Sequence, residues 1–507
     1  MPALLTTPRL ERAARLLWGL VLLTLPVTSF RYMPDFMGRT LIQPLAFYPL
    51  APLIPLLLVL FWRQRRLPLP GNISLLLAFL LFALIASLAG ILYAPIPLRV
   101  ATYDDRVLRA WFSLLVGLAF FFAAFWMNRS ERDIKASLKW IYAGLALTIL
   151  WSLVQALALN TSLIPRSLIN QIQTLFSARP LLPRRISGFA YEPSWLADQF
   201  IIFFLPWVFA ALLARRPLLR QKWVEPLLVL FSLGVLVFTY SRSGLLSALL
   251  CIALVFILTG RDLMRRAWTW LLQPFRRRKL ALTSGLLLRF GLFAVLVAGL
   301  LATAGFLARY DYFARLWDVG EGESAVDYLV DISAGQRLAY MQAGFAVYEG
   351  APLTGAGLGA ASLSLFPNYP DWAFVIPEVA RQLSPDSNLI PNVKSLYVRL
   401  LAETGLPGFW FFVVFFLSFL AFIRRMVISG DAFLRFVAVA GLFAWLGIAI
   451  RNLTQDSFTF PIMWIALGML AGPASGLLKN HSPWRKFNET DTLAPRRARP
   501  ARRRPRL

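Results

Sequence analysis

Long apolar runs constrain this chain more than any other feature of its sequence. A helix needs about 20 apolar residues to cross the hydrocarbon layer, and about twelve such runs recur, separated by short charged connections. Lipid offers no partner to backbone N–H and C=O groups, so each run must be helical. The sequence therefore predicts an all-α integral membrane protein, with spans at residues 12–30, 41–62, 71–93, 107–127, 136–158, 195–214, 223–240, 243–259, 286–307, 407–423, 433–452 and 457–477.

The basic residues indicate how these spans are oriented. A net charge of +27 could suggest a nucleic-acid-binding protein, but the arginines and lysines gather in every second connection. Cytoplasmic connections of membrane proteins carry this excess. We therefore predict a multi-pass protein of the cytoplasmic (inner) membrane with both termini in the cytoplasm, and we expect contact with membrane lipids and none with nucleic acid. The basic connections are residues 63–66, 129–135, 215–222, 261–279 and 424–425.

The largest connection on the predicted outer side differs from all others in composition. Residues 308–406 carry eleven acidic and six basic residues. Helices are predicted at 338–347 and 396–402, the second ending near Gly405. Between them, Gly355, Gly357 and Gly359 indicate a turn where side chains are unwelcome. The predicted organisation is nine spans in 1–307, the outer loop 308–406, three spans in 407–478, and a basic cytoplasmic tail, 479–507, that is too polar to fold.

Metal and ion-transport chemistry find little support in the sequence. The only histidine, His481, lies in the tail and the only cysteine is Cys251, so no metal site or internal disulfide is expected. Ion-coupled transporters keep ionisable groups at membrane depth. Here Asp198, Arg289 and Arg451 lie near predicted span ends, where they are expected to reach water. The sequence favours an enzyme that acts at the outer face of the cytoplasmic membrane. A transporter or flippase of lipid-linked oligosaccharides is the alternative.

Four segments on the predicted outer side carry an ordered series of motifs. The motifs are Arg184-Arg185-Ile-Ser-Gly-Phe-Ala-Tyr-Glu192-Pro193-Ser-Trp, Thr239-Tyr-Ser-Arg242-Ser-Gly, Arg337-Leu-Ala-Tyr with the later Gly355-Ala-Gly357, and Lys394-Ser-Leu-Tyr397-Val-Arg-Leu-Leu-Ala-Glu403-Thr-Gly405. Each motif alone is weak, and their combination is more specific. In this order and spacing they resemble the O-antigen ligase and Wzy-type O-antigen polymerase superfamily of bacterial membrane glycosyltransferases, over about residues 180–460.

The resemblance implies a fold and a reaction. The fold is GT-C-like, with one large helical loop in the periplasm. The reaction is an inverting, metal-independent transfer of glycan from a polyprenyl-diphosphate carrier to a glycan or lipid acceptor, in the biosynthesis of cell-envelope polysaccharide. No cofactor is expected.

The resemblance also assigns diphosphate binding to arginines. Arg242 and Arg337 stand at the positions of the family's diphosphate-binding arginines, and the paired donors of a guanidinium match phosphate oxygens. Arg185 is a weaker candidate of the same kind. For each of the three, an interfacial arginine with no catalytic role is the alternative.

The last motif departs from the family pattern. Many ligases have His-Asn where this chain has Lys394-Ser395, and that histidine is thought to activate the acceptor hydroxyl. A lysine with its ordinary pKa of about 10.4 is protonated at neutral pH and cannot act as a base. Lys394 is therefore either a base with a lowered pKa or an electrostatic contact to diphosphate, and the second role is favoured.

If Lys394 binds diphosphate, proton removal falls to a carboxylate. Glu192 is the first candidate, with Asp386 and Glu403 behind it, although for Glu403 a structural role at a helix end near the membrane is favoured. Tyr397, in the same motif, is a further candidate for the site. The missing histidine and the Glu192-Pro193 segment favour a polymerase over a ligase.

Overall fold

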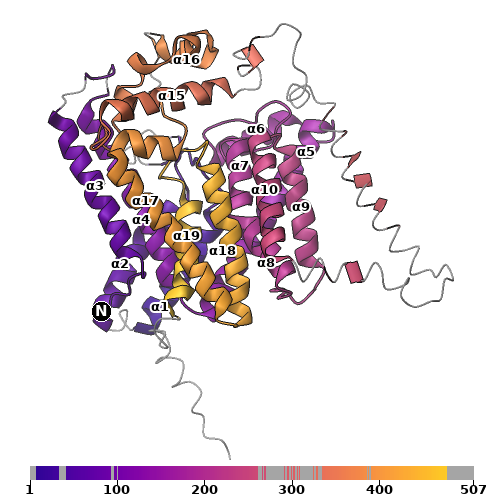
Figure 1. Cartoon of the computed structure of the whole chain (residues 1–507). Helices are drawn as coiled ribbons and strands as arrows, with labels where there is room; N and C mark the ends of the chain where they lie inside the picture. Colours follow the sequence, from indigo (N-terminus) through magenta and orange to yellow (C-terminus); the bar gives the residue numbers. More distant parts are fainter. Residues whose placement is uncertain are drawn as a thin grey trace, which may run out of the picture.

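The computed structural model describes residues 7–33, 41–92, 96–99, 101–260, 334–384, 386–387 and 390–476, with single positions between 265 and 330. Within them the fold is all-α (Figure 1). Eight helices of this part are long and apolar enough to cross a membrane, so the chain is a multi-pass membrane protein. They are α2 (Phe47–Gln64), α3 (Ile73–Leu92), α4 (Tyr103–Met127), α5 (Glu131–Asn160), the composite Pro193–Leu213, α10 (Arg242–Thr259), α17 (Leu396–Ile428) and α18 (Ala432–Arg451).

With three further helices, eleven of the twelve predicted spans have a counterpart among the described helices. They are α1 (Thr7–Thr24) and the shorter apolar helices α9 (Val224–Phe238) and α19 (Pro461–Gly476). Each overlaps a predicted span, as the other eight do. The remaining predicted span, 286–307, and the predicted tail, 479–507, lie outside the continuously described residues.

The centre of the bundle is α19, which is buried from Pro461 to Ala474. It packs against α4, while α17 packs against α3 and α18 against α8 (Figure 1). Glycines permit the closest approach: a Cβ on Gly472 would lie 2.2 Å from the carbonyl oxygen of Asn128. Small residues at helix contacts are the usual means of packing helices within a membrane.

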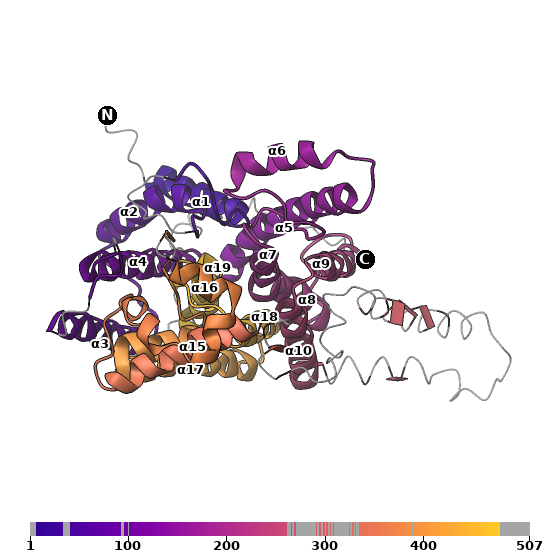
Figure 2. The ribbon, with the colours of Figure 1, turned by 90° about the horizontal axis from the view of Figure 1, so that it is seen from above.

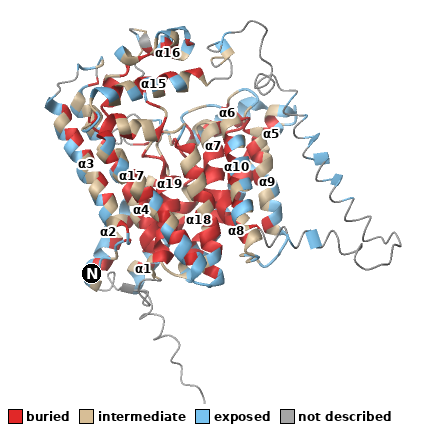
Figure 3. Ribbon diagram, viewed as in Figure 1, coloured by how far each residue is buried: buried red, intermediate tan, exposed pale blue. Residues whose placement is uncertain are grey.

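Apolar residues on the outside of the bundle face away from this core. Figure 3 shows buried positions concentrated on α18 and α8, with exposed ones along α3 and α9. Leu81 and Leu88 on α3 and Leu230 on α9 are all more than half exposed. Exposed leucines on helices of this length are suited to contact with lipid chains.

The composite span Pro193–Leu213 is not a regular α-helix. It consists of α7 (Pro193–Gln199), one turn of π-helix, η3 (Phe200–Phe204), and α8 (Leu205–Leu213). All five residues of η3 are buried. Single π turns inside α-helices often occur at functional sites, and this one directly follows the Glu192 motif.

A layer of short helices covers one end of the bundle. This cap consists of α15 (Gly335–Gly350), the 3₁₀ turns η4 (Ala361–Leu363), η5 (Phe366–Asn368) and η6 (Asp371–Val375), and α16 (Pro377–Leu383). Figure 1 shows it above the ends of α17 and α3. Tyr340, Tyr369 and Val379 belong to its own apolar core. The helix predicted at 338–347 is confirmed as α15.

The helix predicted at 396–402 is confirmed too, and it ends where the glycine indicated. Gly405 has φ 64° and ψ −175° and interrupts α17, whose second part runs on to Ile428. Only glycine adopts this conformation readily. The predicted glycine turn is also present, since Gly355, Gly357 and Gly359 all have positive φ.

Candidate functional site

Helix ends on the cap side of the bundle bring the predicted site residues toward one another. Seen from above, α7, α10 and α18 lie beside one another, with α15 and α17 alongside (Figure 2). Glu192 precedes α7, Arg242 begins α10, Arg337 lies in the first turn of α15, and Lys394 precedes α17. Segments separated by long stretches of sequence therefore converge on one face.

Arg185 and Arg242 belong to the same corner of this face. The Arg185 Nε donates to the carbonyl oxygen of Thr239, 3.0 Å away, which joins the first motif to the second. Ser241 caps α10 by accepting from the backbone N–H of Gly244 at 3.2 Å. A Cβ on Gly244 would lie 2.6 Å from the Cβ of Ala197, so α10 packs tightly against α7.

Glu192 has a cationic partner that the sequence did not reveal. Its Oε1 accepts a hydrogen bond from Arg179 Nη1 at 2.9 Å, and its Oε2 accepts from Ser194 Oγ at 3.3 Å. The Glu192 side chain is 36% exposed, and a pair this open to water contributes at most about 1 kcal/mol to stability. The guanidinium of Arg179 also lies 5.4 Å from the centre of the Tyr191 ring.

Arg337 is half-buried on α15. Asp198 on α7 interacts electrostatically with both Arg337 and Glu192. The structure thus brings Arg337 into the neighbourhood of the Glu192 motif, although 145 positions separate the two residues in the sequence (337 − 192).

Lys394 is held in an unusual backbone conformation. Its φ is +63°, in the left-handed region, which is costly for residues other than glycine. The backbone N–H donates to Asp456 Oδ2 at 3.1 Å. The Nζ lies 5.7 Å from the centre of the Tyr340 ring, one helical turn beyond Arg337. Non-glycine residues in such conformations cluster at functional sites.

The phenol of Tyr340 is fixed on its other side. Its hydroxyl donates to Glu378 Oε1 at 3.2 Å, and the ring is fully buried in the core of the cap. Burial, together with the nearby Glu378 carboxylate, raises the pKa of Tyr340. The phenol therefore stays neutral, and its ring is available to the Lys394 ammonium.

Two of the three secondary candidates, Tyr397 and Glu403, have other partners. The Tyr397 hydroxyl donates to the carbonyl oxygen of Ala449 at 3.0 Å. Glu403 is 3% exposed and accepts from Arg399 Nε at 2.9 Å, an environment that holds the start of α17 in place. Asp386 is exposed in the turn after α16.

The position of Asp386 differs from that of the other candidates. Its turn is tied to the connection between α3 and α4, because Arg99 Nη2 donates to the carbonyl oxygens of Gln382 at 2.6 Å and Ser384 at 2.8 Å. Asp386 is therefore placed with the connection between α3 and α4, whereas Glu192 directly precedes α7, against which the Arg242 helix packs.

The glycine turn is hydrogen-bonded to the first part of α17, just before the break at Gly405. The Ala356 N–H donates to the carbonyl oxygen of Ala402 at 2.8 Å, and the Gly357 N–H to that of Glu403 at 3.0 Å. A Cβ on Gly355 would lie 2.5 Å from the carbonyl carbon of Glu403. The third and fourth motifs are thus one structural unit.

The expectation that Asp198 and Arg451 reach water is wrong. Asp198 on α7 and Arg451 at the end of α18 form a direct ion pair, and their side chains are only 2% and 4% exposed. Each residue lies near the end of a span, as predicted, but packing of α7 against the bundle seals both from water. Arg289 lies outside the described residues.

The site combines cations with one partly exposed carboxylate. Arg242, Arg337 and Lys394 could bind a polyanionic group, because guanidinium groups match phosphate oxygens with paired donors. Glu192 could accept a proton from a neutral nucleophile. Three carboxylates of this region have arginine partners: Glu192 pairs with Arg179, Glu403 with Arg399 and Asp198 with Arg451. Of these three, Glu192 is the one with a substantially exposed side chain.

Comparison with known families supports the predicted resemblance. Residues 227–413 match the family model described as O-Antigen ligase. The matched region runs from α9 into α17 and contains Arg242, Arg337 and Lys394, whereas Glu192 precedes it. The match confirms the resemblance to the O-antigen ligase and polymerase superfamily for this part of the chain. A search of curated proteins finds no match.

Proposed function

We propose that this protein transfers or polymerises glycan from a polyprenyl-diphosphate carrier on the outer face of the cytoplasmic membrane. The observation that carries the proposal is the O-antigen ligase match at residues 227–413, which includes three cations on converging helix ends. Polysaccharide biosynthesis at a membrane follows from the family match and from the multi-pass fold.

The proposed roles follow from the chemistry of the reacting groups. Arg242 and Arg337 bind the diphosphate of the donor, and Lys394 adds a third positive charge. Glu192 leaves Arg179 and accepts the proton of the acceptor hydroxyl as the new C1–O bond forms and the bond from C1 to the diphosphate oxygen breaks. The acceptor oxygen attacks from the face opposite the diphosphate, so the anomeric configuration inverts. Because diphosphate is a good leaving group, a carboxylate is a sufficient base.

The proposed topology follows from the charge distribution. The cap and the rest of 308–406 lie in the periplasm, between the spans of 1–307 and 407–478, and both termini lie in the cytoplasm with the tail 479–507. A lipid-linked donor presents its head group on the same face as the cap. The acceptor is a carrier-linked glycan, and we favour polymerisation over ligation because Lys394 replaces the histidine of many ligases.

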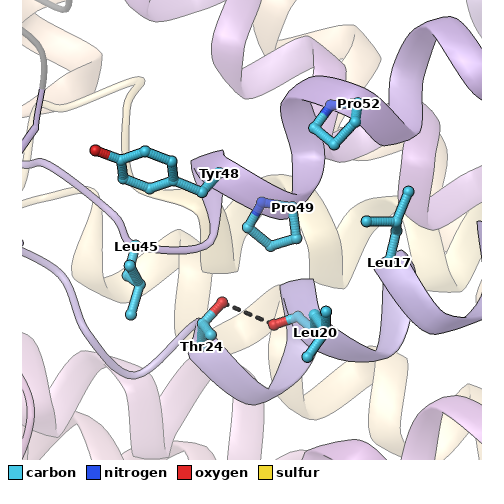
Figure 4. A pocket seen from close by; sticks show the side chains of 7 residues that line it. All are labelled: Leu17, Leu20, Thr24, Leu45, Tyr48, Pro49 and Pro52. Atoms are coloured by element: carbon cyan, nitrogen blue, oxygen red, sulfur yellow. Dashed lines mark hydrogen bonds between the residues drawn. The ribbon is translucent and has the colours of Figure 1, made fainter.

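A transporter or flippase of lipid-linked oligosaccharides is the second candidate. Such a protein would line a central cavity with basic residues that follow the head group across the membrane. A hollow between α1 and α2, in the part of the chain that the structure describes, does not have this character (Figure 4). It is lined by Leu17, Leu20, Thr24, Leu45, Tyr48, Pro49 and Pro52, with no charged side chain. The match of residues 227–413 to the O-antigen ligase family model favours the enzyme.

Glycan analysis of a deletion strain tests the proposal. Loss of long chains, with single repeats still attached to the acceptor, would identify a polymerase, whereas accumulation of free carrier-linked polymer would identify a ligase. Accumulation of donor on the cytoplasmic leaflet would instead support the flippase.

Arginine variants test the diphosphate contacts. Arg242→Lys and Arg337→Lys should each lower turnover at least about tenfold while the protein stays inserted, because lysine lacks the paired donors. Arg424→Lys, at an exposed position near the end of α17, is the matched control and should be neutral. Normal glycan from both site variants would contradict the assignment.

A further inference from the structure

The ion pair between Asp198 and Arg451 is buried at the ends of two described membrane spans. Removing two charges from water costs several kcal/mol per ion, and charges within membrane spans are rare unless they serve a function. Asp198 lies on α7 and Arg451 at the end of α18, 253 positions apart. The pair therefore joins two spans that the sequence does not connect locally.

On the α18 side, the pair adjoins the segment that carries Lys394. The carbonyl oxygen of Asn452, the residue after Arg451, accepts from the Leu396 N–H at 2.9 Å. The Tyr397 hydroxyl donates to Ala449 on the same helix end at 3.0 Å. Residues 395–397 therefore rest directly on the last turn of α18.

On the α7 side, the pair adjoins the segment that carries Glu192. Glu192 is the residue before α7 and Asp198 is its sixth residue. This short helix is anchored by Gln199, whose Nε2 donates to the carbonyl oxygen of Pro26 at 2.9 Å. A Cβ on Gly447 of α18 would lie 3.1 Å from the carbonyl oxygen of Ile201, so the two elements are closely packed below the pair.

We propose that the Asp198–Arg451 pair is a positioning strut that sets the separation between the Glu192 segment and the Lys394 segment. This inference rests on the proposed function, in which Glu192 acts on the acceptor and Lys394 on the donor. The pair contacts neither substrate. It fixes α7, which directly follows Glu192, against the end of α18. The Lys394 segment rests on that end of α18.

The energetics of buried ion pairs distinguish a strut from a simple stabilising contact. Removal of one partner leaves an uncompensated charge, whereas replacement of both by residues of similar volume is often neutral for stability. Asp198→Leu with Arg451→Met should therefore restore folding that either single change disrupts. The direction and geometry of the ionic contact would nevertheless be lost.

The experiment compares folding and turnover in the single variants and the double variant. We expect Asp198→Leu/Arg451→Met to unfold near the wild-type temperature but to turn over at least about tenfold more slowly, because small displacements of reacting groups reduce rates by such factors. Lys135→Met, which removes the exposed ion pair with Glu131 on α5, is the control and should leave turnover unchanged. Wild-type turnover in the folded double variant would overturn the proposal.

A distance measurement provides a readout independent of activity. Cys251 is the only cysteine of the chain, so Cys251→Ala gives a cysteine-free background. Spin labels are then attached at Ala178→Cys and Asn392→Cys. Both positions are exposed, and they lie close in sequence to Arg179 and to Lys394. The double variant should shift or broaden the label-to-label distance distribution. An unchanged distribution would overturn the strut, even if turnover falls.

The strut can still be tested if the apolar double variant does not fold or if the protein transfers no glycan. If the apolar double variant does not fold, Asp198→Asn/Arg451→Gln tests the same point with an uncharged hydrogen-bonded pair, and the same results decide. If the wild-type protein transfers no glycan at all, the proposed function fails, while the label distances still report on the strut.

Discussion

Residue 394 offers a test that separates backbone strain from side-chain charge. Lys394 has a φ of +63°, and a residue other than glycine in the left-handed region costs roughly 1–2 kcal/mol. Its Nζ lies 5.7 Å from the centre of the Tyr340 ring, a contact that returns about 0.5–1 kcal/mol when the cation is partly exposed. Substitutions to alanine and to glycine affect these two contributions differently.

Lys394→Ala keeps the strained backbone and loses the contact with the ring, so we expect a loss of about 0.5–1 kcal/mol in unfolding free energy. Lys394→Gly loses the same contact but relieves about 1–2 kcal/mol of strain. The greater freedom of glycine in the unfolded chain costs about 0.5–1 kcal/mol. The glycine variant should therefore be more stable than the alanine variant by about 0.5–1 kcal/mol.

Thermal unfolding of the purified variants in detergent measures this difference, which corresponds to a shift on the order of 2 °C for a large chain. Glycan transfer is measured on the same samples. Both variants should lose most of their activity, because both lack the ammonium group. Lys394→Arg, which keeps the positive charge, should retain a measurable fraction, and Glu192→Gln should be more damaging because an amide cannot accept the hydroxyl proton.

Two results would refute this reasoning. A glycine variant clearly less stable than the alanine variant would mean that the backbone at 394 is not strained. Complete inactivity of Lys394→Arg in an inserted protein, together with an active Glu192→Gln, would mean that Lys394 is the base and that its role is not electrostatic.

Three further predictions concern the glycine break, the cap tyrosine and the topology. Gly405→Ala should lower stability by about 1–3 kcal/mol or more in thermal unfolding, because its Cβ would lie 2.5 Å from the carbonyl oxygen of Leu353. Gly234→Ala inside α9, where a Cβ meets nothing within 4 Å, should not lower stability, since alanine favours a helix more than glycine does. Burial raises the pKa of Tyr340 above its ordinary value of about 10, so its contribution to stability is complete below about pH 10 and is lost as the pH rises above that value. Tyr340→Phe should therefore reduce the loss of stability that unfolding curves show above about pH 10. A reporter active only outside the cytoplasm should work when fused after residue 345 and be silent after residue 270, and the reverse would contradict the topology.

Part of the candidate site could be found from the sequence because its signals are local. Arg242 and Arg337 were identified from short motifs, and the fold brings both to the cap side with Lys394. The glycine turn at 355–359 and the helix break at Gly405 were predicted from residue type, since a positive φ is costly for other residues. These features need no knowledge of distant partners.

The interactions that organise the site had no such signal. Arg179 pairs with Glu192, and Asp456 holds the backbone of Lys394 from 62 positions away. Both partners lie in polar connections where any arginine or aspartate could be solvated. Which carboxylate meets which cation depends on how the helix ends are placed.

The sequence by itself determined that this chain is an all-α membrane protein, because the length and polarity of each run decide whether lipid can accommodate it. Only the tertiary structure decided what becomes of the polar residues at the ends of those runs. On an isolated helix, the side chains of Asp198 and Arg451 would reach water, because both residues lie near the end of a span. Packing of α7 against α18 excludes that water, and two charges removed from water are stable only when they meet.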